Sequence, residues 1–171
     1  MSRLDSFIRR LLAQRACLGE AAQLVRDLPG PVLEFGLGNG RTYDHLRELL
    51  PEREIFVFDR QVAAHPSCVP DADHMILGEV QETVPKALDR IGARAALAHL
   101  DVGTGDAAAN AALARWFGAA LAPLMRPGAV VVSDQPLEGP GWTALPLPDG
   151  VQPARYFMYR TGAAFRRRGS P

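Results

Sequence analysis

Four acidic residues stand at or next to the ends of short apolar runs in the sequence: Glu34, Asp59, Asp101 and Asp134. Such runs are typical of buried parallel strands, whose carboxyl ends meet at one edge of a sheet, where ligands bind. We therefore expect the four carboxylates to gather around a ligand. Their combined negative charge disfavours a phosphate and favours a neutral or cationic ligand.

Three glycines at alternate positions, Gly36, Gly38 and Gly40, follow the first of these runs. Leucines at helical spacing come next, so the pattern predicts a strand, a glycine loop and a helix over residues 32–46. Because glycine has no side chain, the loop backbone can approach a ligand closely. The ligand then also faces the free N–H groups at the start of the helix.

Two common phosphate-binding loops do not match this segment. The dinucleotide fingerprint G-x-G-x-x-G/A requires a small residue where the chain has Arg41, and no Gly-Lys-Ser/Thr follows. A carboxylate after the second strand, here Asp59, can accept hydrogen bonds from ribose hydroxyls, so we expect a ligand with an adenosine-like or ribose-like part. A nicotinamide-dependent oxidoreductase stays an alternative, which Arg41 disfavours.

Short apolar runs alternate with helical patterns, which predicts an α/β fold with a doubly wound, mostly parallel sheet. The expected strands are 32–35, 55–58, 74–77, 95–100 and 129–133. The expected helices are 42–50, 79–91 and a third that Asp106 caps and that reaches residue 124. Pro85 falls in the early turns of the second helix, where proline is tolerated, and residues 126–128 are expected to form a turn.

Both ends of the chain depart from this alternation. Residues 4–28 carry a helical apolar stripe that Gly19 is expected to divide into two helices covering one face of the sheet. After Asp134, about seven residues precede the next apolar stretch, too few for a parallel crossover. We therefore expect a reduced, antiparallel C-terminal part, with an edge strand over 142–147 and a last strand over 156–160.

The composition predicts a single globular domain over residues 1–171, with 47% hydrophobic and 22% charged residues. Lys plus Arg equals Asp plus Glu at 19 each, which argues against a nucleic-acid surface. Cys17 and Cys68 form no disulfide or zinc pattern and favour a reducing compartment. Because no apolar run is long enough to cross a bilayer and no signal-peptide pattern is present, we expect a cytoplasmic protein without membrane contact.

At this point the chain resembles a known family. Residues 32–40 read V-L-E-F-G-L-G-N-G, which is similar to the E-x-G-x-G-x-G motif of class I S-adenosylmethionine-dependent methyltransferases. Asp59 matches the acidic residue after the second strand of that family, and Asp101 matches the one after the fourth. Residues 77–80 resemble its adenine-side segment, although Asp is commoner there than Glu79.

Residues 124–134 also resemble the helix, turn and strand that precede the end of the fifth strand in this family, so the likeness spans about 30–135. The resemblance implies a Rossmann-like methyltransferase fold, S-adenosyl-L-methionine as cofactor and methyl transfer as the activity. Beyond Asp134 the chain departs from the family pattern, which usually has another helix there, and the acceptor side is the part left open.

The resemblance also implies roles for single residues. Glu34 would help to hold the methionine amino group, directly or through water, while Asp59 would bind the ribose hydroxyls and Arg60 would flank the adenosine. The implied cofactor-binding residues are Glu34, Gly36, Gly38, Asn39, Gly40, Asp59, Arg60, Gly78, Glu79, Val80 and Asp101.

A hydroxyl or amine acceptor must lose a proton during methyl transfer, and Asp101 is the predicted general base, unless it only positions the substrate. His99 lies on the same side of its strand, but its apolar surroundings favour a core role.

Asp101, Asp134 and Gln135 are placed similarly to the Asp, Asp and Asn that hold magnesium in catechol-type O-methyltransferases. A metal-assisted O-methyltransferase is therefore an alternative, which Gln in place of Asn weakens, and no metal ligand belongs to the main interpretation.

The expected partner is a small-molecule acceptor, because no appended nucleic-acid module is visible. An exposed sheet edge could also pair with a second copy, so a homo-oligomer stays open. A cofactor-binding protein without catalysis is the remaining alternative, suggested by the reduced C-terminal part.

Overall fold

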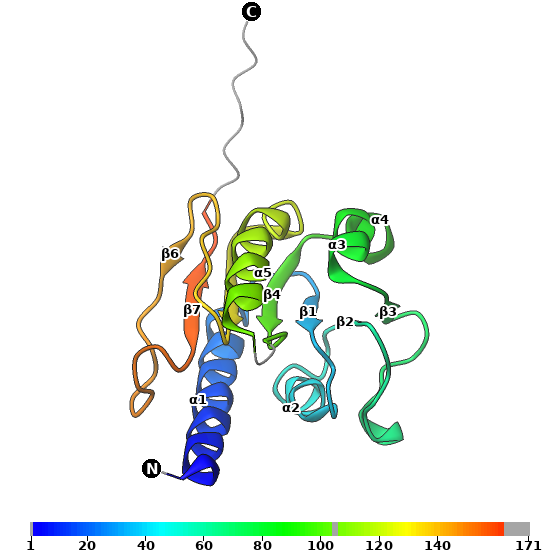
Figure 1. Ribbon diagram of the computed structural model, residues 1–171. Helices are drawn as coiled ribbons and strands as arrows, with labels where there is room; N and C mark the ends of the chain where they lie inside the picture. The colour runs from blue at the N-terminus through cyan, green and yellow to red at the C-terminus, as the bar shows by residue number, and fades with distance from the viewer. Residues whose placement is uncertain (1, 104–105, 163–171) are drawn as a thin grey trace, which may run out of the picture.

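The computed structural model describes residues 2–103 and 106–162, which form one sheet with helices on both faces (Figure 1). The strand order is β3-β2-β1-β4-β5-β7-β6. Five strands are parallel: β1 (Val32–Phe35), β2 (Ile55–Asp59), β3 (Met75–Leu77), β4 (Ala95–Leu100) and β5 (Met125–Ser133). The other two are antiparallel to their neighbours: β6 (Thr143–Ala144) and β7 (Phe157–Arg160). The predicted doubly wound sheet with an antiparallel C-terminal part is confirmed.

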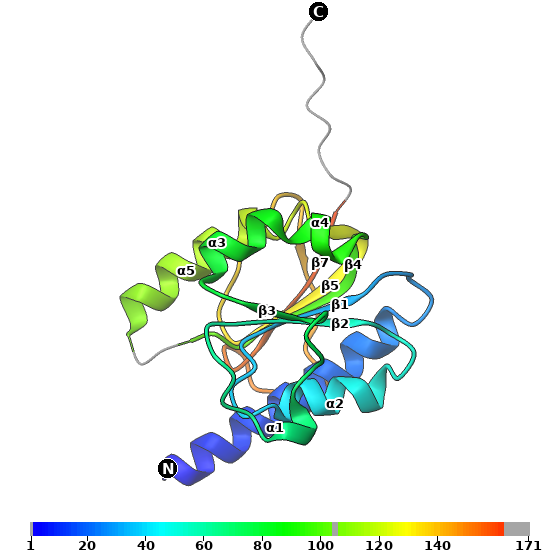
Figure 2. The same ribbon diagram turned by 90° about the vertical axis from the view of Figure 1, so that its right-hand side faces the viewer.

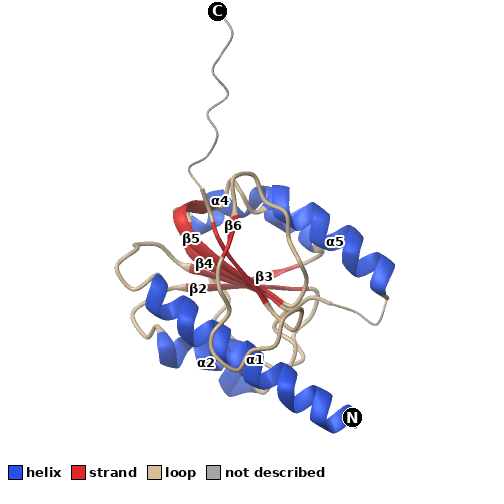
Figure 3. Cartoon of the chain, turned by 90° about the vertical axis from the view of Figure 1, so that its left-hand side faces the viewer, coloured by secondary structure: helices blue, strands red, loops and turns tan. Residues whose placement is uncertain are grey.

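Two layers of helices enclose the sheet (Figures 2 and 3). One face carries α1 (Arg3–Leu24) and α2 (Arg41–Leu49), with a short 3-10 helix, η1 (Pro66–Cys68), beside α2. The other face carries α3 (Val80–Thr83), the 3-10 helix η2 (Val84–Lys86), α4 (Ala87–Ile91) and α5 (Ala107–Ala120). Each layer buries its own apolar cluster against the sheet, so the strand ends are held rigidly where the glycine loop begins.

The prediction of two N-terminal helices is wrong, because α1 runs unbroken through Gly19. A capping box between Ser2 and Asp5 starts the helix, and Cys17 and Leu18 are fully buried on its inner face. A glycine inside a helix costs only about 1 kcal/mol relative to alanine, which this burial outweighs. The unbroken α1 carries Arg10 and Gln14 to the carboxyl edge of the sheet, where both contact Asp101.

Two further expectations need correction. The helix expected over 79–91 is divided, because Pro85 lies in η2, and a proline lacks the N–H that a continuous α-helix needs. Residues 126–128, expected as a turn, lie inside β5, where the pairing with β4 shifts register and Gly128 has a φ of 82°. A bulge thus replaces the turn.

Within the described ranges no helix is long and apolar enough to span a bilayer.

Candidate active site

The glycine loop joins β1 to α2 at the carboxyl edge of the sheet, and each of its three glycines has a positive φ. A Cβ atom on Gly36 would lie 2.5 Å from the backbone oxygen of Asp101, and one on Gly40 would lie 2.5 Å from the Cβ of Cys68. Nothing lies within 4 Å of the corresponding position on Gly38. Gly36 and Gly40 therefore let the loop pack against the protein, whereas Gly38 faces open space.

Asp59, at the end of β2, holds this loop in place. Its Oδ2 accepts hydrogen bonds from the backbone N–H groups of Leu37 at 2.7 Å and Gly38 at 3.2 Å, and its Oδ1 accepts one from Gln61 at 3.2 Å. Loop donors that could bind a phosphate thus already serve a carboxylate. This arrangement agrees with the expectation of a ligand that is not anionic.

A cleft of about 290 Å³, which we call the strand-end cleft, opens beside the loop. Its walls combine Phe58, Val80 and Leu113 with the polar side chains of Asp59 and Glu79. The predicted residues Gly36, Gly38, Arg60 and Asp101 line it too. At its mouth, the Arg60 guanidinium lies 4.0 Å from the Glu79 carboxylate.

A second cleft of about 190 Å³, the α1 cleft, lies between α1 and the glycine loop. Phe7, Arg10 and Gln14 form its helical wall, and Asn39 and Arg41 belong to the opposite wall. Its lining shares three residues with the strand-end cleft, namely Gly36, Gly38 and Asp101. The two clefts therefore adjoin at Asp101 and the glycine loop and form two halves of one groove.

Two side chains of α1 fix the Asp101 carboxylate at this junction. The Arg10 guanidinium lies 2.8 Å from Oδ1 and 3.0 Å from Oδ2, and the Gln14 amide donates to Oδ2 at 2.9 Å. Sequence reasoning missed both residues, although their spacing of four positions places them on one face of a helix. Asp101 stays half-buried, so it can still face a ligand.

A buried chain of hydrogen bonds continues from Gln14 beneath the groove. Gln14 donates to the Tyr156 hydroxyl at 2.7 Å, which lies 2.9 Å from Nε2 of His99, and Nδ1 of His99 lies 2.7 Å from the Glu34 carboxylate. The Thr42 hydroxyl donates to the other Glu34 oxygen. Burial lowers the pKa of His99, but the hydrogen-bonded Glu34 carboxylate and the charges of Asp101 and Asp134 together raise that pKa above its ordinary value.

Three of the predicted site residues line neither cleft. Glu34 is fully buried with both carboxylate oxygens bonded to protein, Gly40 packs on Cys68, and Gly78 ends β3 with a φ of 140°. His99 is likewise fully buried, as its apolar strand favoured. Glu34 and His99 therefore lie beneath the groove and support its lining without being part of it.

Asp134 and Gln135 line a small cavity with Ser133, and this cavity adjoins the strand-end cleft through Val102, Gly103 and Leu113. Burial, followed by the charge of Asp101, raises the pKa of Asp134, whose Oδ1 has no hydrogen-bond partner in the part of the chain that the structure describes. The Gln135 amide nitrogen lies 3.3 Å from the other oxygen of Asp134. No group of three His, Cys, Asp or Glu among the described residues is arranged to hold a metal ion.

Strand order, glycine loop and the carboxylate after β2 together define a Rossmann-like, nucleoside-binding α/β enzyme class. The profile of a family described as S-adenosyl-L-methionine methyltransferase matches residues 1–161. The crystal structure of the S-adenosyl-L-methionine methyltransferase from Silicibacter pomeroyi DSS-3 is 45% identical, with a TM-score of 0.89 over 95% of this chain and 99% of that one. The chain belongs to this family, and it is an S-adenosyl-L-methionine-dependent methyltransferase rather than a nicotinamide-dependent oxidoreductase.

More distant structures share the fold alone. A putative caffeoyl-CoA O-methyltransferase from Staphylococcus aureus is 14% identical, with a TM-score of 0.56 over 85% of this chain and 82% of that one. The RNA-capping protein VP4 of bluetongue virus is 12% identical, with a TM-score of 0.54 over 86% of this chain and 26% of that one. The comparison with curated proteins gave no match.

The contrast between Gly36 and Gly38 gives a testable expectation. Gly38→Val should abolish binding of S-adenosylhomocysteine, because only the space of the groove lies within 4 Å of this position, and its φ of 51° should cost the fold about 1–3 kcal/mol of strain without any added clash. Gly36→Ala should instead lower the free energy of unfolding by about 2 kcal/mol or more, since it combines a φ of 93° with a backbone clash. Urea unfolding and calorimetric titration measure both effects, and unimpaired binding by Gly38→Val would contradict the assignment of the loop.

Proposed function

We propose that this enzyme transfers the methyl group of S-adenosyl-L-methionine to a small-molecule acceptor in the α1 cleft. The observation that carries the proposal is the junction at Asp101, where the strand-end cleft and the α1 cleft share their lining. An enzyme for group transfer needs two binding spaces that meet at one point. A cleft of about 190 Å³ suits a small acceptor better than a polymer.

The strand-end cleft fits an adenosine group. Asp59 would hold the ribose hydroxyls, because its Oδ1 accepts a single hydrogen bond from the described protein and a carboxylate oxygen can accept two. Phe58, Val80 and Leu113 would pack against the adenine, with Glu79 at the edge.

S-adenosyl-L-methionine supplies an electrophilic methyl group on sulfur when it is bound. The chain's own residues would orient the acceptor and remove its proton. Asp101 would accept that proton, and Arg10 and Gln14 would act as positioning residues that fix its carboxylate. Phe7 and Leu11 line the α1 cleft and would limit the access of water.

A metal-assisted O-methyltransferase is the second candidate. The buried Asp134 oxygen without a partner among the described residues favours it, because a cation would satisfy this oxygen. The ion pair of Arg10 with Asp101 counts against it, since a metal would have to displace the guanidinium. Full methyl transfer in the presence of EDTA would exclude this candidate.

Ligand binding and turnover test the main proposal. S-adenosylmethionine and S-adenosylhomocysteine should raise the melting temperature and NAD should not; at 100 times the Kd, a ligand adds about 2.7 kcal/mol to stability. With an acceptor identified by screening hydroxyl and amine compounds for S-adenosylhomocysteine release, Asp101→Asn should lower kcat by roughly 100-fold or more. It should change cofactor affinity far less. Equal losses in kcat and affinity would remove Asp101 from the role of general base.

A further inference from the structure

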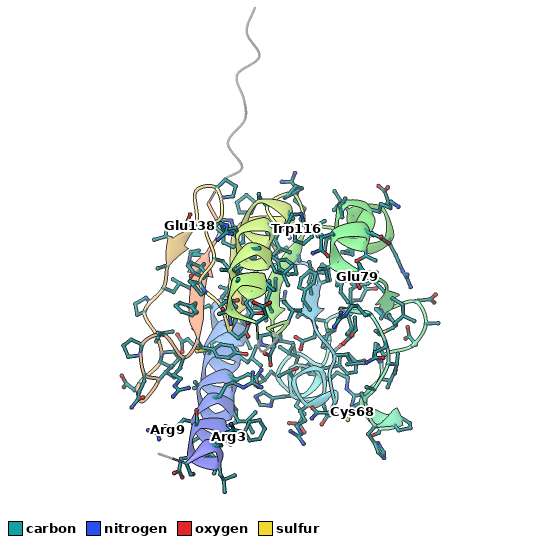
Figure 4. All side chains as sticks on the ribbon, in the orientation of Figure 1. Arg3, Arg9, Cys68, Glu79, Trp116 and Glu138 are labelled. Carbon is teal, nitrogen blue, oxygen red and sulfur yellow. The ribbon has the colours of Figure 1, made fainter. Side chains whose placement is uncertain are left out.

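A third cavity, of about 330 Å³, lies on another flank of α1 and shares no lining residue with the groove. We call it the arginine cavity. Arg9, Ala13 and Ala16 belong to one face of α1, and the opposite wall is the 149–155 segment that leads into β7. In the view of Figure 4, Arg9 lies on the other side of α1 from Glu79 of the strand-end cleft.

Positive charge dominates the lining of this cavity. Arg9, Arg15 and Arg155 face it, against a single carboxylate, Asp149. None of the three arginines forms an ion pair within the described part of the chain. Two of them donate hydrogen bonds to neutral oxygens: Arg155 donates to the Ser6 hydroxyl at 3.4 Å, and Nε of Arg9 donates to the backbone oxygen of Asp5 at 3.3 Å.

The backbone beside Arg155 is strained. Ala154 has a φ of 62°, and no other non-glycine residue in the described ranges has a positive φ. L-residues rarely adopt this conformation, and such strain concentrates where the chain must present a side chain in a fixed direction for binding. Here the strained residue immediately precedes the guanidinium that crosses from the β7 segment to α1.

Apolar surface completes the lining. Leu12 is 49% exposed, and Ala13, Ala16 and Val151 lie beside it. Guanidinium groups pair with carboxylate and phosphate oxygens, often through two parallel hydrogen bonds. We propose that the arginine cavity is a binding site for a small organic anion, a carboxylate or phosphate monoester with an apolar chain.

The site has a structural connection to the catalytic edge. Arg155 precedes Tyr156, whose hydroxyl contacts His99 and Gln14, and Gln14 donates to Asp101. The ligand of the arginine cavity is nevertheless separate from the methyl acceptor, because the cavity shares no lining residue with the groove. The existence of the site does not depend on the function proposed for Asp101.

Titration of the full chain with butyl phosphate, and with inorganic phosphate at the same ionic strength, tests this proposal. We expect saturable binding of butyl phosphate that is tighter than that of inorganic phosphate. Arg9→Gln and Arg155→Gln should each weaken it at least about tenfold. Arg115→Gln, which removes an exposed arginine of α5, is the matched control and should change nothing.

Affinity for S-adenosylhomocysteine serves as the second measurement. It should be unchanged in Arg9→Gln and Arg155→Gln, which shows that these variants fold and separates the cavity from the cofactor site. Mass spectrometry after incubation with S-adenosylmethionine should show the bound probe unaltered, because the cavity is separate from the groove, and a methylated probe would contradict this separation. Absence of saturable binding in the wild type, or an equal loss in Arg115→Gln, would overturn the proposal.

Discussion

Replacement of Asp59 by asparagine should lower the affinity for S-adenosylhomocysteine about 100-fold. The carboxylate accepts hydrogen bonds from Leu37, Gly38 and Gln61, and in the proposed complex it also accepts from the ribose hydroxyls. An amide offers one acceptor oxygen in place of two and carries no charge. Hydrogen bonds to charged groups contribute about 1.5–3 kcal/mol each, and 100-fold corresponds to about 2.7 kcal/mol. Isothermal titration calorimetry measures the change directly.

Two comparisons separate ribose binding from support of the loop. A 2′,3′-dideoxy analogue of S-adenosylhomocysteine should bind wild-type protein more weakly but lose little further affinity in Asp59→Asn, because the contacts with the hydroxyls are already missing. Asp73→Asn, in the exposed segment before β3, is the control and should bind like the wild type. If Asp59→Asn weakens both ligands equally, the carboxylate only holds the loop.

Local patterns were sufficient to predict the strands next to the site. Residues 32–35 and 95–100 match β1 and β4 at both ends, because each is a fully buried run, apolar except for Glu34 or His99, with a clear boundary signal. Gly19 and residues 126–128 misled the prediction, since helix continuity and a bulge depend on what packs against the segment. Glycine and proline mark turns only where tertiary contacts do not override them.

The candidate site shows the same division between local and long-range information. The glycine loop and Asp59 could be found from spacing, since both belong to one βαβ unit. Arg10 lies 91 positions from Asp101, and Gln14 lies 142 positions from Tyr156, so no local pattern pairs them. The burial of Glu34 against His99 could not be predicted either. The parallel register of β1 and β4 places these two residues side by side, and that pairing is known only once the strand order is known.

This adjacency of Glu34 and His99 leads to a large expected effect on stability. Both side chains are fully buried, with 2.7 Å between Nδ1 of His99 and the Glu34 carboxylate. Removal of one partner from a buried ion pair leaves the other without compensation, which typically costs about 3–5 kcal/mol. Glu34→Gln should therefore lower the free energy of unfolding by this amount near pH 6, as measured by urea denaturation.

The pH dependence of stability distinguishes this ion pair from a neutral hydrogen bond. The folded pKa of His99 lies above its ordinary value of 6.5 because Glu34, Asp101 and Asp134 together raise it by more than burial lowers it. Between those two values the folded state holds a proton that the unfolded state has released, so stability falls as pH rises from about 6.5 through the folded pKa. Glu34→Gln should diminish this decline, because it removes the largest of the charges that raise the pKa of His99.

The contribution of His74 to the pH dependence must be removed in the same experiment. Asp71 raises the pKa of His74 as well, so His74 also makes stability fall as pH rises. We therefore compare Glu34→Gln with wild-type Glu34 in a His74→Gln background, with unfolding measured from pH 6 to about pH 9. A decline that persists undiminished without Glu34 would mean that His99 is neutral in the folded protein. The buried chain from Glu34 to Asp101 would then be held by neutral hydrogen bonds, and Glu34 would not control the protonation of His99 beneath the groove.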